Sequence, residues 1–133
     1  MKRITAIILI YTLFVSACSK SNDDDNFSGA LKKEPLQITI AKPESNARFQ
    51  KNDTVFIEVF LWDELSLHDY VITIKNNNGF EYYSKAGHTH FPEFTVSDFW
   101  INTAKAGEDL YLEVIANNHN NFIQKEKIKI LNP

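Results

Sequence analysis

The chain of 133 residues has one cysteine, one methionine, four glycines and four prolines. A single cysteine cannot form a disulfide within the chain, so any folded domain must be held together by its apolar core. The net charge at pH 7 is −3, from 14 basic and 17 acidic side chains. A chain of this charge lacks the basic surface that nucleic-acid binding requires, and no nucleic-acid partner is predicted.

Sequence signatures of catalysis are also missing. The sequence contains no Gly-x-Ser-x-Gly nucleophile motif and no glycine-rich phosphate loop. Its carboxylates are scattered through turns, which gives no support to the paired arrangement of a glycosidase. The sequence therefore does not predict an enzyme.

The one cysteine, Cys18, directly follows a short apolar N-terminus. Residues 1–3 are Met-Lys-Arg, residues 4–15 are mostly apolar, and Ser16 and Ala17 are the small residues of a cleavage site. The apolar stretch is shorter than the roughly 20 residues that cross a bilayer. We therefore predict a cleaved signal peptide over residues 1–17.

The segment Val15-Ser16-Ala17-Cys18 resembles a bacterial lipobox. The resemblance implies that Cys18 carries a lipid, becomes the first residue of the mature protein and anchors it in a membrane. The thiol then serves neither as a nucleophile nor in a disulfide. The alternative is an ordinary secretory signal with a cysteine nearby by chance.

Residues 18–34 are predicted to be the lipidated cysteine and an acidic tether. Residues 19–26, SKSNDDDN, contain no apolar side chain to bury, which favours disorder. Lipoproteins of the Bacteroidetes type carry a similar acidic cluster after the lipidated cysteine. The resemblance implies an outer membrane lipoprotein exposed at the cell surface. Here the aspartates begin a few positions later than in the tightest form of that pattern, and a plain solvated spacer is the alternative.

Residues 35–133 are enough for one domain, and their patterning predicts an all-β fold. Residues 54–62 alternate, with four aliphatic side chains on one face and Phe56, Glu58, Phe60 and Trp62 on the other. Six further strands are predicted, over residues 36–40, 70–74, 80–84, 94–101, 110–116 and 123–131. Short strands separated by turns at this spacing favour a two-sheet antiparallel sandwich.

The motif order over residues 36–131 resembles bacterial immunoglobulin-like domains. The matching segments are Ile38-x-Ile40-x-x-Pro43, Arg48-Phe49-x-Lys51-Asn52-Asp53-x-Val55, Tyr70-x-Ile72-x-Ile74 and Gly107–Asn117. The resemblance implies an immunoglobulin-like β-sandwich of about seven strands, as in small Bacteroidetes-type lipoproteins with one such domain of unassigned role. The cysteine pair of antibody domains is missing, and a shared fold does not carry a function with it.

All four histidines lie in or beside the loops expected after the second, fourth and sixth strands, residues 63–66, 85–92 and 117–121. In a sandwich of this strand order these loops gather at one end. The i, i+2 spacing of His88 and His90 directs both rings to one face of an extended chain. We therefore predict a zinc or copper site formed by His88, His90 and His119, completed by His68, Asp63 or Glu64. The alternative is that loops simply collect polar residues.

A second hypothesis needs no metal and uses the aromatic side chains, which are 13% of the sequence. Outward-facing aromatic rings stack on sugars or anchor a protein partner. An envelope protein or a glycan would then bind through Trp62, Trp100, Tyr82 and Tyr83. The competing interpretation is that the core of the sandwich absorbs these rings.

Overall fold

The computed structural model of the protein describes residues 36–133. The signal peptide, the lipidation of Cys18 and the tether fall in residues 1–35, outside the described part of the chain, and stay predictions. Lys33–Pro133 form one compact unit, which contains both sheets. Residues 36–133 contain no helix long and apolar enough to cross a membrane.

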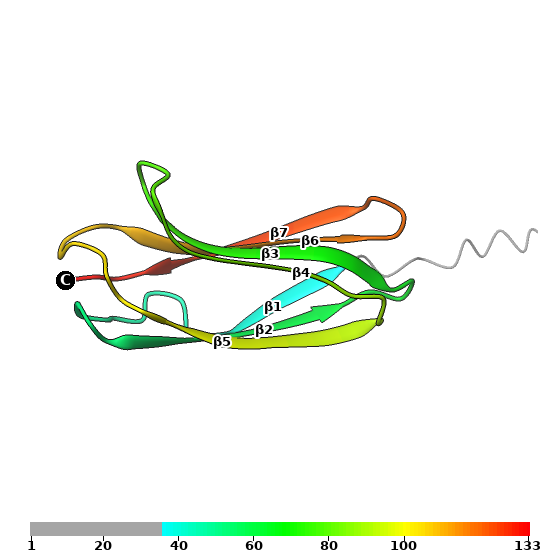
Figure 1. The fold of residues 1–133 in the computed structure, drawn as a ribbon, viewed down its shortest axis with the longest axis horizontal. Helices are drawn as coiled ribbons and strands as arrows, with labels where there is room; N and C mark the ends of the chain where they lie inside the picture. The colour runs from blue at the N-terminus through cyan, green and yellow to red at the C-terminus, as the bar shows by residue number, and fades with distance from the viewer. Residues whose placement is uncertain (1–35) are drawn as a thin grey trace, which may run out of the picture. The chain divides into compact units, whose positions relative to one another are not determined.

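Seven antiparallel strands form two sheets in the described residues (Figure 1). The strands are β1 (Gln37–Lys42), β2 (Thr54–Trp62), β3 (Leu67–Asn76), β4 (Glu81–His88), β5 (Glu93–Ile101), β6 (Leu110–Asn118) and β7 (Ile123–Ile130). One sheet has the order β1-β2-β5 and the other the order β4-β3-β6-β7. The expected immunoglobulin-like sandwich is confirmed. Its fourth strand pairs with the third, whereas in antibody constant domains the corresponding strand joins the first sheet.

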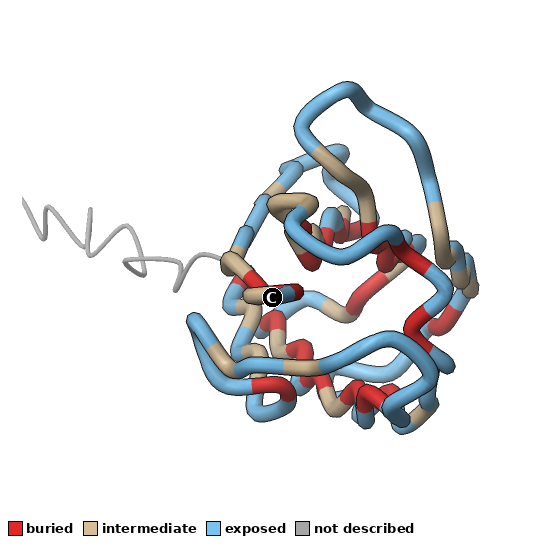
Figure 2. The backbone as a smooth tube through the Cα atoms, turned by 90° about the vertical axis from the view of Figure 1, so that its left-hand side faces the viewer, coloured by how far each residue is buried: buried red, intermediate tan, exposed pale blue. Residues whose placement is uncertain are grey.

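The core lies between the two sheets and follows from the alternation of the strands. In β2 every second side chain from Val55 to Leu61 is buried, and in β6 the same holds from Leu110 to Ala116. Figure 2 shows buried segments in both layers. These apolar rows hold the domain together without a disulfide.

Three loops meet at one end of the sandwich, as expected from the strand order. They are residues 63–66 between β2 and β3, residues 89–92 between β4 and β5, and residues 119–122 between β6 and β7 (Figure 1). We call these three loops, with the strand residues that flank them, the histidine end. The chain also enters β1 here, because Gln37 pairs with Trp62, the last residue of β2.

Two strand boundaries differ from the sequence prediction by three or four residues. β3 begins at Leu67 rather than at residue 70, and β4 continues to His88 rather than ending at residue 84. The ladder between them extends because Asp69 still pairs with His88. His68 and His88 therefore lie on strands, not in loops. Gly87 lies within β4, where a glycine is required because a Cβ would be 2.3 Å from the Tyr70 ring.

Candidate metal centre

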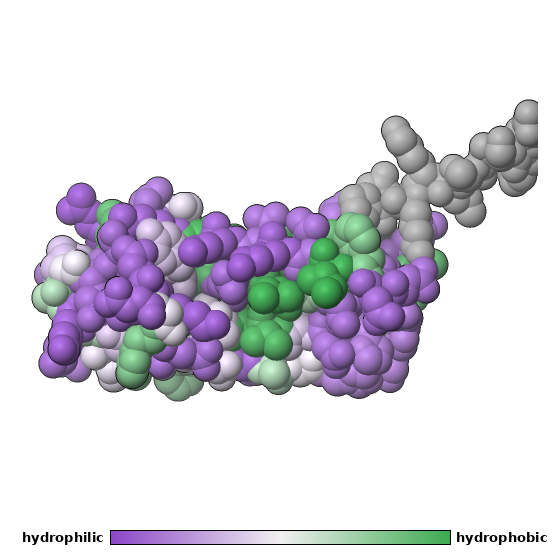
Figure 3. Space-filling model, turned by 90° about the horizontal axis from the view of Figure 1, so that it is seen from above, coloured by the Kyte–Doolittle hydropathy of each residue, from purple (hydrophilic) through white to green (hydrophobic). Residues whose placement is uncertain are grey.

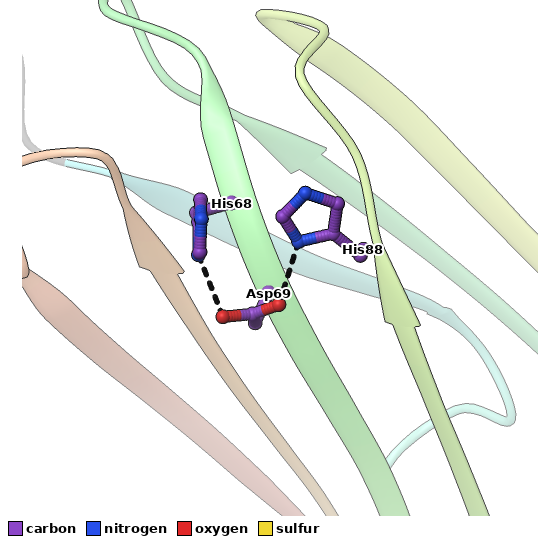
Figure 4. Close-up of side chains that lie close together, drawn as sticks. All are labelled: His68, Asp69 and His88. Atoms are coloured by element: carbon purple, nitrogen blue, oxygen red, sulfur yellow. Dashed lines mark hydrogen bonds and ion pairs between the residues drawn. The ribbon is translucent and has the colours of Figure 1, made fainter.

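The carboxylate of Asp69 joins two of the four histidines (Figure 4). Nδ1 of His68 lies 2.6 Å from one carboxylate oxygen, and Nδ1 of His88 lies 2.8 Å from the other. The hydrogen bond from His88, followed by that from His68, lowers the pKa of Asp69. Asp69 is therefore an ionised acceptor that holds a proton on Nδ1 of each ring.

An irregularity in β3 brings His68 and Asp69 to the same side. Adjacent residues of a regular strand point to opposite faces, yet these two side chains bond to each other. The pairing of β3 with β6 shifts register between Leu67 and Tyr70. The N–H of Asp69 is taken by the side-chain oxygen of Asn117 at 2.7 Å. Such bulges re-aim side chains, and here the bulge turns a carboxylate toward a histidine.

His88 and His90 flank a buried threonine in the connection between β4 and β5. Thr89 faces inward, and its N–H donates to the carbonyl oxygen of His68 at 2.8 Å. Both histidines are exposed, and their Nε2 atoms lie 2.9 Å apart. The i, i+2 spacing thus places the two rings on the same side, as the sequence predicts.

The loop that carries His119 is anchored by Asn118. The buried Asn118 side chain accepts the N–H groups of Asn120 and Phe122 at 3.0 and 3.1 Å. Its amide donates to Asp63 at 2.9 Å, which fastens this loop to the loop between β2 and β3. The anchored loop places the His119 ring against those of His68 and His90, with centroid distances of 4.8 and 4.9 Å.

The remaining contacts complete a chain of imidazoles. Nδ1 of His90 lies 2.9 Å from Nε2 of His119. With the rings neutral, one placement of protons satisfies every contact: His119 donates to His90, His90 to His88, and His88 to Asp69. Loss of solvent around His90, followed by the charges of His88 and His119, lowers the pKa of His90 and keeps that ring neutral at pH 7.

The four rings lie side by side, and in residues 36–133 the donor atoms of His68, Asp69 and His88 all lie within 4.8 Å of one another. The His68 ring centroid lies 4.4 Å from that of His88 and 4.8 Å from that of His119. Imidazole nitrogens bind zinc at about 2.0–2.1 Å, so neighbouring ligand atoms of a tetrahedral site lie about 3.3–3.4 Å apart. The Nε2 atoms of His88 and His90 lie 2.9 Å apart, at hydrogen-bond distance, and would have to separate by about 0.4 Å to bind one tetrahedral ion. Because Asp69 holds a proton on Nδ1 of His68 and His88, the unprotonated Nε2 atoms of these rings are the ones available to a metal.

Neither of the two carboxylates expected at the site, Asp63 and Glu64, contacts the histidines; the carboxylate found there is that of Asp69. Asp63 is buried, and its oxygens accept hydrogen bonds from the Leu65 N–H at 2.8 Å and from Asn118. It fixes two loops and does not face the histidines. Glu64 is exposed in the same turn, and none of the histidine contacts in residues 36–133 involves it. Asp69 takes their place. The one feature of the sequence that could have pointed to it is that it directly follows a histidine, His68.

The aromatic residues expected to bind a partner do not form an exposed platform. Trp100 is buried, and Trp62 is half-buried. Tyr82 and Tyr83 are half-buried, and their hydroxyls donate to carboxylates, that of Tyr83 to Asp98 at 2.9 Å. Burial, followed by the hydrogen bond to Asp98, raises the pKa of Tyr83. Of these four rings, Trp100 is thus withdrawn from the surface, whereas Trp62, Tyr82 and Tyr83 stay partly exposed.

A shallow apolar groove begins beside the cluster on the outer face of the four-stranded sheet. Asp69 contributes to both the groove and the histidine cluster. The groove has a volume of about 190 Å³ and is lined by Asp69, Tyr70, Val71, Ile115, Ala116, Asn117 and Ile123. Figure 3 shows an apolar patch on this face between hydrophilic regions. The apolar surface thus continues away from the histidine end along the sheet.

Comparisons with known proteins bear on the fold alone. No family model matches the chain, and no curated protein matches it. Among solved structures, the chain is similar to the CARDB domain of the PF1109 protein from Pyrococcus furiosus, which was crystallised in complex with di-metal ions. The TM-score is 0.42 at 12% identity, covering 74% of this chain and 93% of that one.

A second similar structure is Spo0M, a sporulation control protein from Bacillus subtilis. The TM-score is 0.41 at 9% identity, covering 73% of this chain and 48% of that one. At these identities nothing of either protein's binding or biological role is transferred to this chain. By the order of its own strands, the chain is an immunoglobulin-like β-sandwich with a four-histidine cluster at one end.

Proposed function

We propose that the domain is a binding module of the cell envelope that takes a zinc or copper ion through His68, His88, His90 and His119. The observation that carries this proposal is the carboxylate of Asp69, which bonds to Nδ1 of both His68 and His88. When a ligating histidine donates its other ring N–H to a carboxylate, the carboxylate fixes the tautomer and raises the basicity of the metal-binding nitrogen.

The donor set favours binding over catalysis. Four imidazoles fill the four positions of a tetrahedral site, whereas catalytic zinc sites keep one position open for water or substrate. Imidazole suits zinc and copper, and calcium and magnesium prefer oxygen ligands. The rings lie at the surface, so an ion can reach the site without opening the core. These features fit capture, storage or delivery of a metal.

The proposal places the module on a membrane. The lipobox-like segment ending at Cys18 supports lipid anchoring, and the acidic cluster that follows supports the outer membrane and the cell surface. In that setting an envelope protein could hand over or receive the ion.

The metal content of the purified chain tests the proposal. Residues 19–133, which include the whole compact unit, are loaded with zinc or copper(II), freed of unbound metal and analysed by mass spectrometry of the elements. We expect about one ion per chain in the wild type. The change of both His88 and His90 to alanine should abolish retention, whereas the control Asp109→Ala, just before β6 and away from the histidine end, should not. Equal retention by the wild type and the double variant would refute the site.

A further inference from the structure

Each loop of the histidine end carries a large exposed apolar side chain. Leu65 is 43% exposed, Phe91 is 67% exposed and Phe122 is 46% exposed. They belong to the three different loops that gather at this end. Single exposed apolar residues are common on proteins, but three on loops that gather at one end are typical of a surface that contacts a partner.

The backbone N–H groups of these three residues already have hydrogen-bond partners within the protein. The N–H of Leu65 donates to the Asp63 side chain at 2.8 Å, and the N–H of Phe122 to the Asn118 side chain at 3.1 Å. The N–H of Phe91 donates to the hydroxyl of Thr89 at 3.3 Å. An N–H left without a partner makes entry into lipid costly. Here a side-chain oxygen of the same loop or its flanking strand residue satisfies each one.

The chain outside the described residues reaches the domain at this same end. Gln37 pairs with Trp62, and the adjacent Leu36 is buried. The 17 residues from 19 to 35 separate Cys18 from Leu36 and can span at most about 56 Å, at about 3.3 Å per residue. A lipid on Cys18 would therefore attach the domain to the bilayer through its histidine end.

The charges of the loops decide what kind of contact this surface makes. The three loops contain no lysine or arginine, and their acidic residues are Asp63, which is buried, and Glu64. Attraction to anionic headgroups therefore cannot drive the contact, and burial of apolar side chains must.

We propose that the histidine end docks on a lipid bilayer and inserts Leu65, Phe91 and Phe122 into its interface. The docking stands on the loops and on the predicted lipid at Cys18. Only its consequence, that a bound metal ion is held at the membrane surface, rests on the proposed function.

Binding to vesicles tests the docking. Residues 19–133, which lack the acylated cysteine, are sedimented with vesicles of phosphatidylethanolamine and phosphatidylglycerol. We expect binding that persists at high salt, and a loss of about tenfold in the partition coefficient for each of Phe91→Ser and Phe122→Ser. Phe80→Ser is the matched control, because Phe80 is 60% exposed and follows the turn at the opposite end. This variant should bind as the wild type does.

Tryptophan fluorescence gives a second readout of orientation. Trp62 lies at the histidine end and is half-buried, whereas Trp100 is buried and pairs with Val55 at the start of β2. Brominated lipids should quench the emission of a Trp100→Phe variant, in which Trp62 is the one remaining tryptophan. Quenching should fall with Phe91→Ser.

Several outcomes overturn the docking proposal. These are no binding to vesicles, equal loss with Phe80→Ser, or binding that high salt abolishes. A lipid-free dimer that Phe91→Ser dissociates would assign the surface to a second copy of the chain, which also overturns it. Metal titration keeps the two proposals apart: Phe91→Ser should bind metal normally, and the variant with alanine at His88 and His90 should bind vesicles normally.

Discussion

Asp69→Asn removes the charge that accepts hydrogen bonds from His68 and His88 and keeps the size of the side chain. An amide has one oxygen, so it can accept from one of the two rings and presents its NH₂ group to the other. The second ring must then rotate or move its proton to Nε2, the nitrogen that would bind the metal. We expect metal binding to be weakened and not abolished.

The size of this effect can be worked out. Loss of a carboxylate behind a ligating histidine weakens affinity by about 10–100-fold, or about 1.4–2.7 kcal/mol. Metal at a hundred times Kd stabilises the folded state by about 2.7 kcal/mol, and at ten times Kd by about 1.4 kcal/mol. Each kcal/mol shifts the Tm of a domain of this size by about 4–8 °C. Metal should therefore raise the wild-type Tm by about 11–22 °C, and the Tm of a tenfold-weakened variant by about half as much.

Two measurements on residues 19–133 check this prediction. Calorimetric titration with zinc gives the affinity, and thermal melts followed by circular dichroism give the shift in Tm. Asp109→Asn is the matched control, since Asp109 pairs with Lys129 at 2.7 Å, far along β6 from the cluster. Wild-type affinity in Asp69→Asn would refute the orienting role. Complete loss of binding would instead make Asp69 a direct ligand, the role that its carboxylate, within 4.8 Å of the donor atoms of His68 and His88, also permits.

Three further predictions concern stability. Gly87→Ala should cost about 1–3 kcal/mol by overpacking, because the new Cβ would lie 2.3 Å from the Tyr70 ring. Urea unfolding measures the cost, and a second change, Tyr70→Leu, should recover part of it, whereas no recovery would place the clash elsewhere. Asn118→Ala should cost about 1–3 kcal/mol in the same assay, because it leaves the buried Asp63 carboxylate without its amide partner; an unchanged midpoint would contradict this. The lowered pKa of His90 predicts that the metal-free protein loses stability as pH falls below 6.5 and through the folded-state pKa, since the unfolded chain takes up the proton first. Urea unfolding at a series of pH values should show this loss in the wild type and less of it in His90→Gln, and equal loss in both would rule out His90 as its source.

The strands could be predicted because they depend on the local alternation of apolar and polar residues. The gathering of the loops at one end then followed from the order of the strands. β2 spans Thr54–Trp62, the bounds that the sequence indicates, because four aliphatic side chains at every second position must share one buried face. Once seven strands are placed in this order, antiparallel pairing alone brings the loops after β2, β4 and β6 to one end.

The details of the site could not be predicted because they depend on distant contacts. The bulge that turns Asp69 toward His68 is held by Asn117, 48 residues further along the chain. The end of β4 at His88 is set by pairing with β3 and not by the local sequence. Alternation also shows that Phe99 and Trp100 face opposite sides, but not which side the second sheet covers; the structure buries Trp100.

The direct pairing of Asp69 with His88 makes the cluster sensitive to strand register. β4 is an edge strand, held on one side by β3 alone in its sheet. Slipping it by one residue would turn His88 to the opposite face and separate it from the carboxylate. A bound ion would stabilise the in-register pairing and no other, so it would act as a clamp that keeps an edge strand from slipping or pairing with another molecule.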